Sequence, residues 1–195
     1  MLLYASTSNR DKLAEFIHAG QSAGVRGLLI EPLPGLRDIV PPEENGSSYG
    51  QNASIKALYY SAFTSELVFA DDSGIEAEAL GGAPGVHSAC YAGPTASYAE
   101  NNARLLRELE NQSNRKGRFV CAIALAQAGT VKGVVCASVD GEILSEPLGD
   151  RGFGYDPLFF YAPLGRSFGE LPGPEKFSVS ARGKAFRMLL DAIRD

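Results

Sequence analysis

The stretch Glu66-Leu67-Val68-Phe69-Ala70-Asp71-Asp72-Ser73-Gly74 places two adjacent carboxylates directly after an apolar run. The run predicts a short buried strand, so the aspartates follow its carboxyl end, where α/β proteins bind ligands. Two neighbouring negative charges are costly to bury unless a cation or hydrogen bonds compensate them, and a magnesium ion would do so. Because side chains alternate along a strand, we expect one of Asp71 and Asp72 to face a metal and the other the protein frame. A polar turn is the alternative for Asp-Asp-Ser-Gly taken alone.

The composition is that of a globular protein. The chain has 195 residues, of which 45% are hydrophobic and 21% are charged. This suffices for one domain, or for two lobes that share a sheet, without disulfides. No apolar run approaches the roughly 20 residues that span a bilayer, and the first residues lack the basic segment of a signal peptide. We therefore expect a cytoplasmic protein with no membrane partner.

The counts of charged residues, cysteines and histidines exclude several kinds of site. Eighteen basic and 23 acidic residues give a net charge of −5, and no basic stripe suits a phosphate backbone, so nucleic acid is not an expected partner. Cys90, Cys121 and Cys136 form no Cys-x-x-Cys pair, and we interpret them as small buried hydrophobes. With only two histidines in the sequence, the chemistry has to come from carboxylates, lysines, arginines and hydroxyls.

Hydrophobic spacing predicts an α/β order of elements in one undivided domain, residues 1–195. Strands are expected at 2–5, 28–32, 67–71, 118–128 and 131–143, with 76–80 as a hairpin partner of the third strand and a hairpin turn at Gly129. Helices are expected after the N-cap Asn9, over 49–63, and after the capping box Ser97-Tyr98-Ala99-Glu100. A last helix carries its apolar residues at spacings of three and four, namely Ala185, Met188, Leu189, Ala192 and Ile193.

Four further segments carry candidate chemistry. Residues 7–12 gather hydroxyls, a helix start and a lysine, which suits a phosphate or simply a capped helix. Lys56 is the only charged residue between Asn45 and Ser65, so it either lies along the surface or points to an anion. Residues 152–157 combine two glycines, two aromatic rings and a carboxylate, as in a ligand loop or in a plain turn. Residues 175–182 gather donors at a helix start, which suits an anion or a solvated cap.

Together these segments resemble the inosine triphosphate pyrophosphatase family, the XTP/dITP diphosphatases. The resemblance covers nearly the whole chain in five ordered blocks. These are residues 7–12, then 43–44 with 52–56, then 70–74 with 81–86 and 91–93, then 152–157, and finally 180–183. It implies a mixed, elongated central β-sheet flanked by helices, two lobes with the active cleft between them, and a homodimer.

The resemblance also implies a reaction. Water would attack the α-phosphorus of a deaminated purine nucleoside triphosphate, namely ITP, dITP or XTP, and release a monophosphate and pyrophosphate. Glu44 and Asp72 would hold Mg²⁺, Asp72 would orient or deprotonate the water, and Asp71 would support them. The residues that would bind the substrate are Thr7, Ser8, Asn9, Arg10, Asp11, Lys12, Lys56, Ser73, Phe153, Gly154, Tyr155, Asp156, Lys176, Ala181 and Arg182.

Selectivity would depend on the edge of the base. If Arg182 donates to the 6-oxo group and Asp156 or a nearby carbonyl accepts from N1–H, adenine leaves both groups mismatched. The chain departs from the family pattern, because Ala181 stands where the family usually has His, Cys90 where it has Arg, and Gln51 where it has Glu. These departures leave two alternatives open: a purine-nucleotide sensor with weakened turnover, and a pyrophosphatase of broader or pyrimidine specificity.

Overall fold

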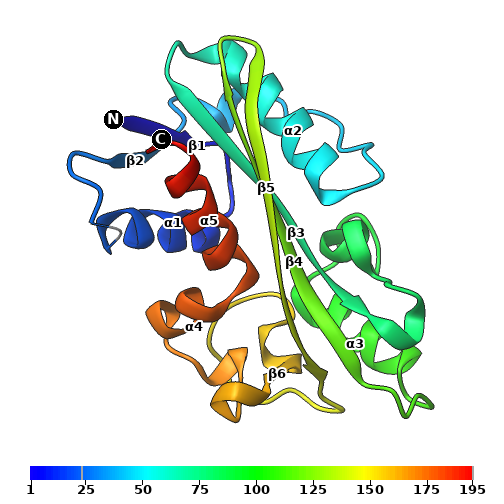
Figure 1. Cartoon of the computed structure of the whole chain (residues 1–195). Coiled ribbons are helices and arrows are strands. Elements are labelled where there is room, and N and C mark those ends of the chain that lie inside the picture. Colours follow the sequence, from blue (N-terminus) through cyan, green and yellow to red (C-terminus); the bar gives the residue numbers. More distant parts are fainter. Residues whose placement is uncertain (23, 195) are drawn as a thin grey trace. The chain divides into compact units, whose positions relative to one another are not determined.

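The computed structural model describes residues 1–22 and 24–194 and contains a seven-stranded sheet with helices packed on it (Figure 1). The strand order is β2-β1-β3-β4-β5-β6-β7. The strands are β1 (Leu2–Ala5), β2 (Leu29–Pro32), β3 (Leu67–Ala77), β4 (Lys116–Gln127), β5 (Thr130–Ile143), β6 (Phe159–Tyr161) and β7 (Arg166–Ser167). β1 pairs in parallel with β2 and β3, whereas β6 pairs antiparallel with β5 and β7, so the mixed sheet expected from the sequence is confirmed.

Among the residues that the structure describes, five α-helices accompany the sheet. They are α1 (Arg10–Ser22), α2 (Tyr49–Tyr60, continued by a 3₁₀ turn at Ser61–Phe63), α3 (Tyr98–Glu108), α4 (Gly173–Val179) and α5 (Ala181–Ala192). Asn9 caps α1 as predicted, because its Oδ1 accepts from two amides of the first turn at 2.9 and 3.1 Å. Ser97 and Glu100 form the predicted capping box of α3. Within the described residues, every helix is too short or too polar to cross a bilayer.

The chain divides into two compact units. One comprises Met1–Asp72, Cys121–Ala137 and Arg182–Asp195, and the other comprises Ser73–Val120 and Ser138–Ala181. The divisions fall inside β3, β4, β5 and α5, at positions where the backbone continues as strand or helix.

Aromatic rings form the centre of each unit. In the first unit, Phe16 of α1 lies 5.0 Å from Phe69 of β3 and 5.2 Å from Phe186 of α5, measured between ring centroids. Such pairs add to the stabilisation from burial itself, and they dock both helices on the sheet. The buried face of α5 includes Phe186, whereas Met188 is 45% exposed. The predicted apolar face of this helix is therefore wrong at Met188 and at Ala192, which is also exposed, because the buried residues include the adjacent pairs Ala185–Phe186 and Leu189–Leu190.

β3 runs without a break from Leu67 to Ala77 and contains the aspartate pair. The expected end of the strand at Asp71 and the expected hairpin partner at 76–80 are therefore wrong. Gly74 allows a close approach and makes no turn: a Cβ at this position would lie 2.4 Å from the Gly85 carbonyl oxygen and 2.4 Å from Ser88 Oγ. The same Ser88 Oγ accepts a hydrogen bond of 3.0 Å from the Ile75 amide.

We expect Gly74→Ala to lower the free energy of unfolding by about 1–3 kcal/mol, because the new methyl group overpacks the contact with Gly85 and Ser88. Urea unfolding followed by circular dichroism measures this change. Gly133→Ala on β5 is the matched control, since a Cβ there meets no atom within 4 Å. Equal losses in the two variants would contradict the close-approach explanation.

Two other local predictions have mixed outcomes. β4 and β5 are neighbours joined at Ala128 and Gly129, which both have positive φ, and this confirms the predicted hairpin. Cys121 is buried, as interpreted from the sequence. Cys90 and Cys136 are exposed, so for them the interpretation as buried hydrophobes is wrong.

Candidate active site

Lys56 on α2 points at two carboxylates. Its Nζ lies 2.6 Å from Glu44 Oε2 and 3.3 Å from Asp72 Oδ1, and its side chain is 14% exposed. Glu44 precedes α2 in the chain and Asp72 lies in β3, so two separate segments converge on one cation. Of the two interpretations left open by the sequence, the structure supports the one in which this solitary lysine points to an anion.

Asn52 ties the Glu44 segment to Asp72. It is buried on α2, one helical turn before Lys56, and its Nδ2 donates to Asp72 Oδ2 at 3.3 Å. Its Oδ1 accepts from the Gly46 amide at 2.8 Å. Sequence reasoning gave Asn52 no role, although its i, i+4 relation to Lys56 places both side chains on one face of the helix.

Asp71 points toward α1 and α5, whereas Asp72 points toward α2. Asp71 Oδ2 lies 2.9 Å from Lys12 Nζ of α1 and 3.4 Å from Arg182 Nε of α5. Arg182 Nη1 in turn lies 2.7 Å from Glu15 Oε2, also on α1. Figure 1 shows α1 and α5 near each other and apart from α2. The predicted alternation of the two aspartates along the strand is confirmed.

Glu15 is a second residue that the sequence reasoning missed. It follows Lys12 by one helical turn, so the two side chains share a face of α1, and this spacing is the signal that could have identified it. The Arg182 guanidinium is held by both Glu15 and Asp71, and the sequence did not predict this structural ion pair. The base-reading role implied for Arg182 stays a prediction.

The surroundings of the two aspartates move their pKa values in opposite directions. Burial alone would raise the pKa of Asp71, but the charges of Lys12 and Arg182 outweigh it and hold this pKa well below its usual value. Burial raises the pKa of Asp72, and the neighbouring Glu44 charge adds to the rise against the opposing effect of Lys56. Asp71 is therefore a fixed anion, whereas Asp72 is the carboxylate better suited to accept a proton.

Lys56 remains a cation despite its burial. Burial lowers the pKa of Lys56, but the charges of Asp72, Asp71 and Glu44 together outweigh this effect and raise it above the ordinary lysine value. The ammonium group thus stays available for pairing with negative groups, which include its present carboxylate partners and a phosphate brought by a ligand.

Glu44 and Asp72 form a donor set that suits Mg²⁺. Magnesium prefers oxygen ligands and is usually held by one or two carboxylates together with waters and substrate phosphates. Across residues 1–22 and 24–194, no three His, Cys, Asp or Glu side chains gather in a metal-binding group. Glu44 and Asp72 supply two carboxylates, which is the number of protein ligands that Mg²⁺ commonly uses.

The segment at residues 7–12 contributes unequally to this cluster. Thr7 Oγ1 accepts from the Asn9 amide at 3.3 Å, and Lys12 reaches Asp71. The side chains of Ser8, Arg10 and Asp11 are exposed. Ser73 is half-buried directly after the aspartate pair, and Ala181 is buried at the start of α5. The substrate contacts expected of all these residues stay predictions.

A separate cluster lies within the second unit. Lys176 Nζ pairs with Asp156 Oδ2 at 2.8 Å, and the two side chains are only 4% and 7% exposed. Asp156 Oδ2 also accepts from the Phe153 amide at 2.8 Å, and the Lys176 ammonium lies 4.5 Å from the centroid of the Phe153 ring. The Tyr155 hydroxyl donates to the Ser88 carbonyl at 2.8 Å, so its polar end is bound within the protein. This cluster contains Phe153, Asp156 and Lys176, three of the residues that the resemblance implies for substrate binding.

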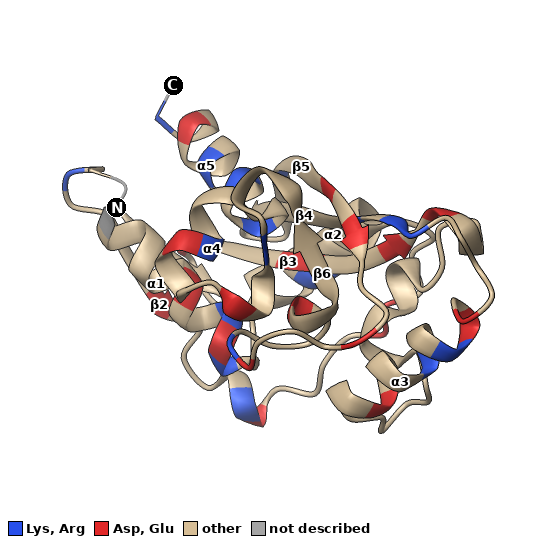
Figure 2. Cartoon of the chain, turned by 90° about the horizontal axis from the view of Figure 1, so that it is seen from below, with Lys and Arg blue, Asp and Glu red and all other residues tan. Residues whose placement is uncertain are grey.

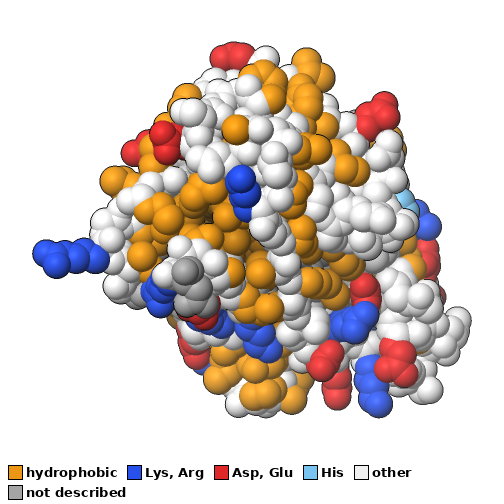
Figure 3. Space-filling view, turned by 45° about the horizontal axis from the view of Figure 1, so that its top comes forward, with side chains coloured by type: hydrophobic (Ala, Val, Ile, Leu, Met, Phe, Trp, Pro, Cys, Tyr) orange, Lys and Arg blue, Asp and Glu red, His pale blue; other side chains and the backbone are white. Residues whose placement is uncertain are grey.

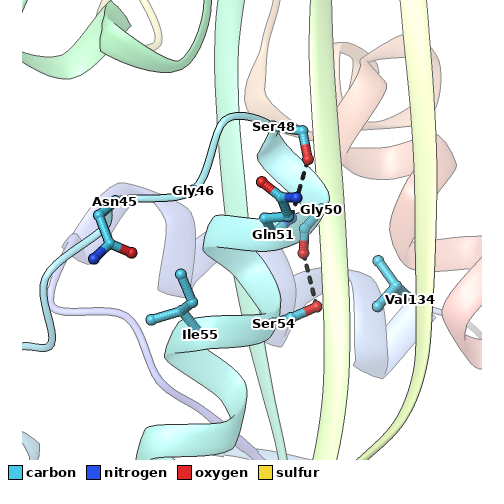
Figure 4. Close-up of a pocket in the computed structure, with 8 residues that line it drawn as sticks. All are labelled: Asn45, Gly46, Ser48, Gly50, Gln51, Ser54, Ile55 and Val134. Carbon is cyan, nitrogen blue, oxygen red and sulfur yellow. Dashed lines mark hydrogen bonds between the residues drawn. The ribbon is translucent and has the colours of Figure 1, made fainter.

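A pocket of about 630 Å³ opens beside the first turns of α2 (Figure 4). Its lining consists of Asn45, Gly46, Ser48, Gly50, Gln51, Ser54, Ile55 and Val134. Within it, Ser54 Oγ donates to the Gly50 carbonyl at 2.7 Å, and the backbone N–H of Gln51 donates to Ser48 Oγ at 3.3 Å. The lining carries no charged side chain, so it differs from the carboxylate and lysine cluster.

Comparison with known proteins identifies the family. The model of the Ham1 family matches residues 3–192. A dITP/XTP pyrophosphatase of Desulforamulus reducens is 40% identical over 99% of this chain and 96% of its own length, and one of an Exiguobacterium species is 44% identical over 84% and 83%. A HAM1 protein from Coxiella burnetii has a similar structure, with a TM-score of 0.88 and 34% identity over 100% of this chain and 98% of that one. The chain belongs to the Ham1 family.

Proposed function

We propose that this chain is a Mg²⁺-dependent pyrophosphohydrolase of the cytoplasmic nucleotide pool, folded as one catalytic domain. It converts ITP, dITP and XTP to the nucleoside monophosphate and pyrophosphate. The observation that carries the proposal is the convergence of Glu44 and Asp72 on the Lys56 ammonium group. Relatives with 40% and 44% identity that are named dITP/XTP pyrophosphatases support the choice of substrate.

In this proposal the residues of the cluster divide the work of hydrolysis. Asp72 accepts a proton from the attacking water, to which its raised pKa is suited. Lys12 and Lys56 neutralise the triphosphate, and Asp71 holds Lys12 in place as a fixed anion. Mg²⁺ held by Glu44 and Asp72 would supply further charge neutralisation at the phosphates. The water oxygen forms the new bond to the α-phosphorus while the bond to the leaving pyrophosphate breaks.

A substrate panel tests the proposal. Pyrophosphate release from ITP, dITP, XTP, GTP, ATP and dUTP is measured with Mg²⁺ present. We expect turnover of the first three, with ATP rejected by roughly 10⁴-fold if the polar edge of the base is read. Preference for dUTP would overturn the purine assignment. Binding of ITP without any turnover would overturn the enzymatic proposal in favour of a sensor.

Glu44→Gln is expected to raise the Mg²⁺ concentration needed for half-maximal activity by at least about ten-fold, since even the loss of an outer-shell partner costs this much metal affinity. A magnesium titration of ITP hydrolysis measures the shift. Glu43→Gln is the matched control, because Glu43 is an adjacent, exposed carboxylate. Indistinguishable titration curves for the two variants would remove Glu44 from the metal site.

We also propose a homodimer, as the resemblance implies. Val40 and Phe63 are 78% and 51% exposed, and Tyr59 links them. The Tyr59 hydroxyl donates to the Val40 carbonyl at 2.9 Å, and its ring centroid lies 5.5 Å from that of Phe63. Exposed apolar side chains that lie beside one another can mark an interaction site. Figure 3 shows apolar side chains exposed on one face of the molecule. Light scattering should give twice the chain mass of 20.7 kDa, and the mass of one chain would contradict the dimer.

A further inference from the structure

The loop around Phe153 contains two glycines, which allow many backbone conformations, and neighbouring side chains hold it in one of them. Gly152 and Gly154 have φ values of 71° and 62°, which favour glycine. A Cβ on Gly152 would lie 2.1 Å from Asp156 Oδ2, so glycine is also needed for Asp156 to reach the Phe153 amide. On this side the loop is held by Asp156 and, through the ion pair, by Lys176 of α4.

Helix α3 holds the same loop through two residues one turn apart. The Tyr98 ring centroid lies 6.3 Å from that of Phe153, and Asn102 Nδ2 donates to the Gly154 carbonyl at 3.0 Å. α3 also carries charged residues of both signs (Figure 2), including an ion pair between Arg104 and Glu108. The two contacts of α3 with the loop are made by Tyr98 and Asn102.

Asparagine at position 102 does not give the fold its greatest stability. Its Oδ1 is buried and finds no hydrogen-bond partner in the described part of the chain. An unpaired buried acceptor costs more than one neutral hydrogen bond typically contributes, whereas an apolar side chain of the same shape carries no such cost. An apolar residue of this shape, such as leucine, would lack the N–H donor to the Gly154 carbonyl.

We propose that Asn102 is a positioning residue for nucleobase recognition. By holding the Gly154 carbonyl, it restricts the rotation of a two-glycine loop and so fixes the plane of the Phe153 ring between Tyr98 and Lys176. This inference rests on the proposed function and on the substrate-binding role that the resemblance implies for Phe153, and it takes the Phe153 ring as the surface that meets the purine. It extends that function to a residue of α3, outside the loop and the helix starts that the resemblance implicates.

Asn102→Leu tests the proposal, because leucine has the same number and branching of side-chain heavy atoms as asparagine and lacks both the donor and the unpaired acceptor. We expect the KM for ITP to rise about five- to ten-fold, the loss of one neutral hydrogen bond, with kcat within about two-fold of the parent value. The thermal midpoint of unfolding should be unchanged or higher. Asn111→Leu, at an exposed position just beyond α3, is the control and should match the parent in all three measurements.

Calorimetry separates this inference from the proposed function. The dissociation constant of inosine monophosphate should rise about five- to ten-fold in Asn102→Leu, while that of inorganic tripolyphosphate, which has no base, should not change. A parent protein that releases no pyrophosphate from any triphosphate would overturn the proposed function, and the monophosphate titration would still test Asn102. Unchanged monophosphate binding, or equal weakening of both ligands, would overturn the positioning role.

Discussion

Replacing Asp72 by Asn is expected to reduce kcat for ITP by at least about 10³-fold. Loss of a general base costs about 10²–10⁴-fold, and the same change removes a charged ligand from the proposed metal site. The fold should persist, because Asn has the same shape and retains an oxygen for the Asn52 amide. The pKa of Asp72 is raised, so folding disfavours its charged form, and at pH 7 the variant should unfold at the same temperature or higher.

Single-turnover kinetics, with enzyme in saturating excess over ITP and with Mg²⁺ present, measure this loss at the chemical step. Asp140→Asn is the control, since Asp140 is an exposed carboxylate on β5, and its kcat should equal that of the parent. A kcat for Asp72→Asn within ten-fold of the parent would show that another group activates the water. A large fall in the unfolding temperature would instead show that Asp72 is needed mainly for the fold.

The order of most elements could be predicted because their signals are local, whereas β6, β7 and α4 were not predicted. The Asn9 cap, the Ser97 capping box and the hairpin turn at Gly129 each depend on residues within a few positions of one another. Gly74 was misleading because its contacts, Gly85 and Ser88, lie more than ten positions away. A glycine after two aspartates has the composition of a turn, and only the packed structure shows that the missing Cβ makes room for another segment.

The site could be predicted to a similar extent. Period-two alternation was enough to predict that Asp71 and Asp72 point to opposite faces of the strand. The isolation of Lys56 in its helix left an anion partner as one of two interpretations, and the structure supports it. The partners of these charged residues were harder to predict, because the sequence around a charged residue does not show which opposite charge will lie beside it in the fold. Arg182 and Asp71 are 111 positions apart, and a donor at a helix start was naturally interpreted as facing the ligand.

Arg182→Ala is expected to lower the free energy of unfolding at pH 7 by about 3–5 kcal/mol, the usual cost of removing one partner of a buried ion pair. The Asp71 side chain is 1% exposed and would lose the guanidinium group at its Oδ2, and Glu15 would lose the same group, which now lies 2.7 Å away. Urea unfolding at pH 7 measures the loss. Arg194→Ala is the control, because its pair with Asp191 is exposed and its removal should change stability by less than about 0.5 kcal/mol.

Acidification should narrow the difference between Arg182→Ala and the parent protein. The folded pKa of Asp71 lies below the ordinary carboxyl value near 3.8, so its ionised form stabilises the fold above that pH. This contribution falls as the pH drops through 3.8 toward the folded pKa, because the unfolded chain then binds a proton that the native protein does not. Without Arg182 the pKa of Asp71 rises, so the variant has less of this stabilisation to lose. The two unfolding curves should therefore approach each other between about pH 5 and pH 3, and a constant gap would show that Arg182 stabilises the fold by packing and not through the charge of Asp71.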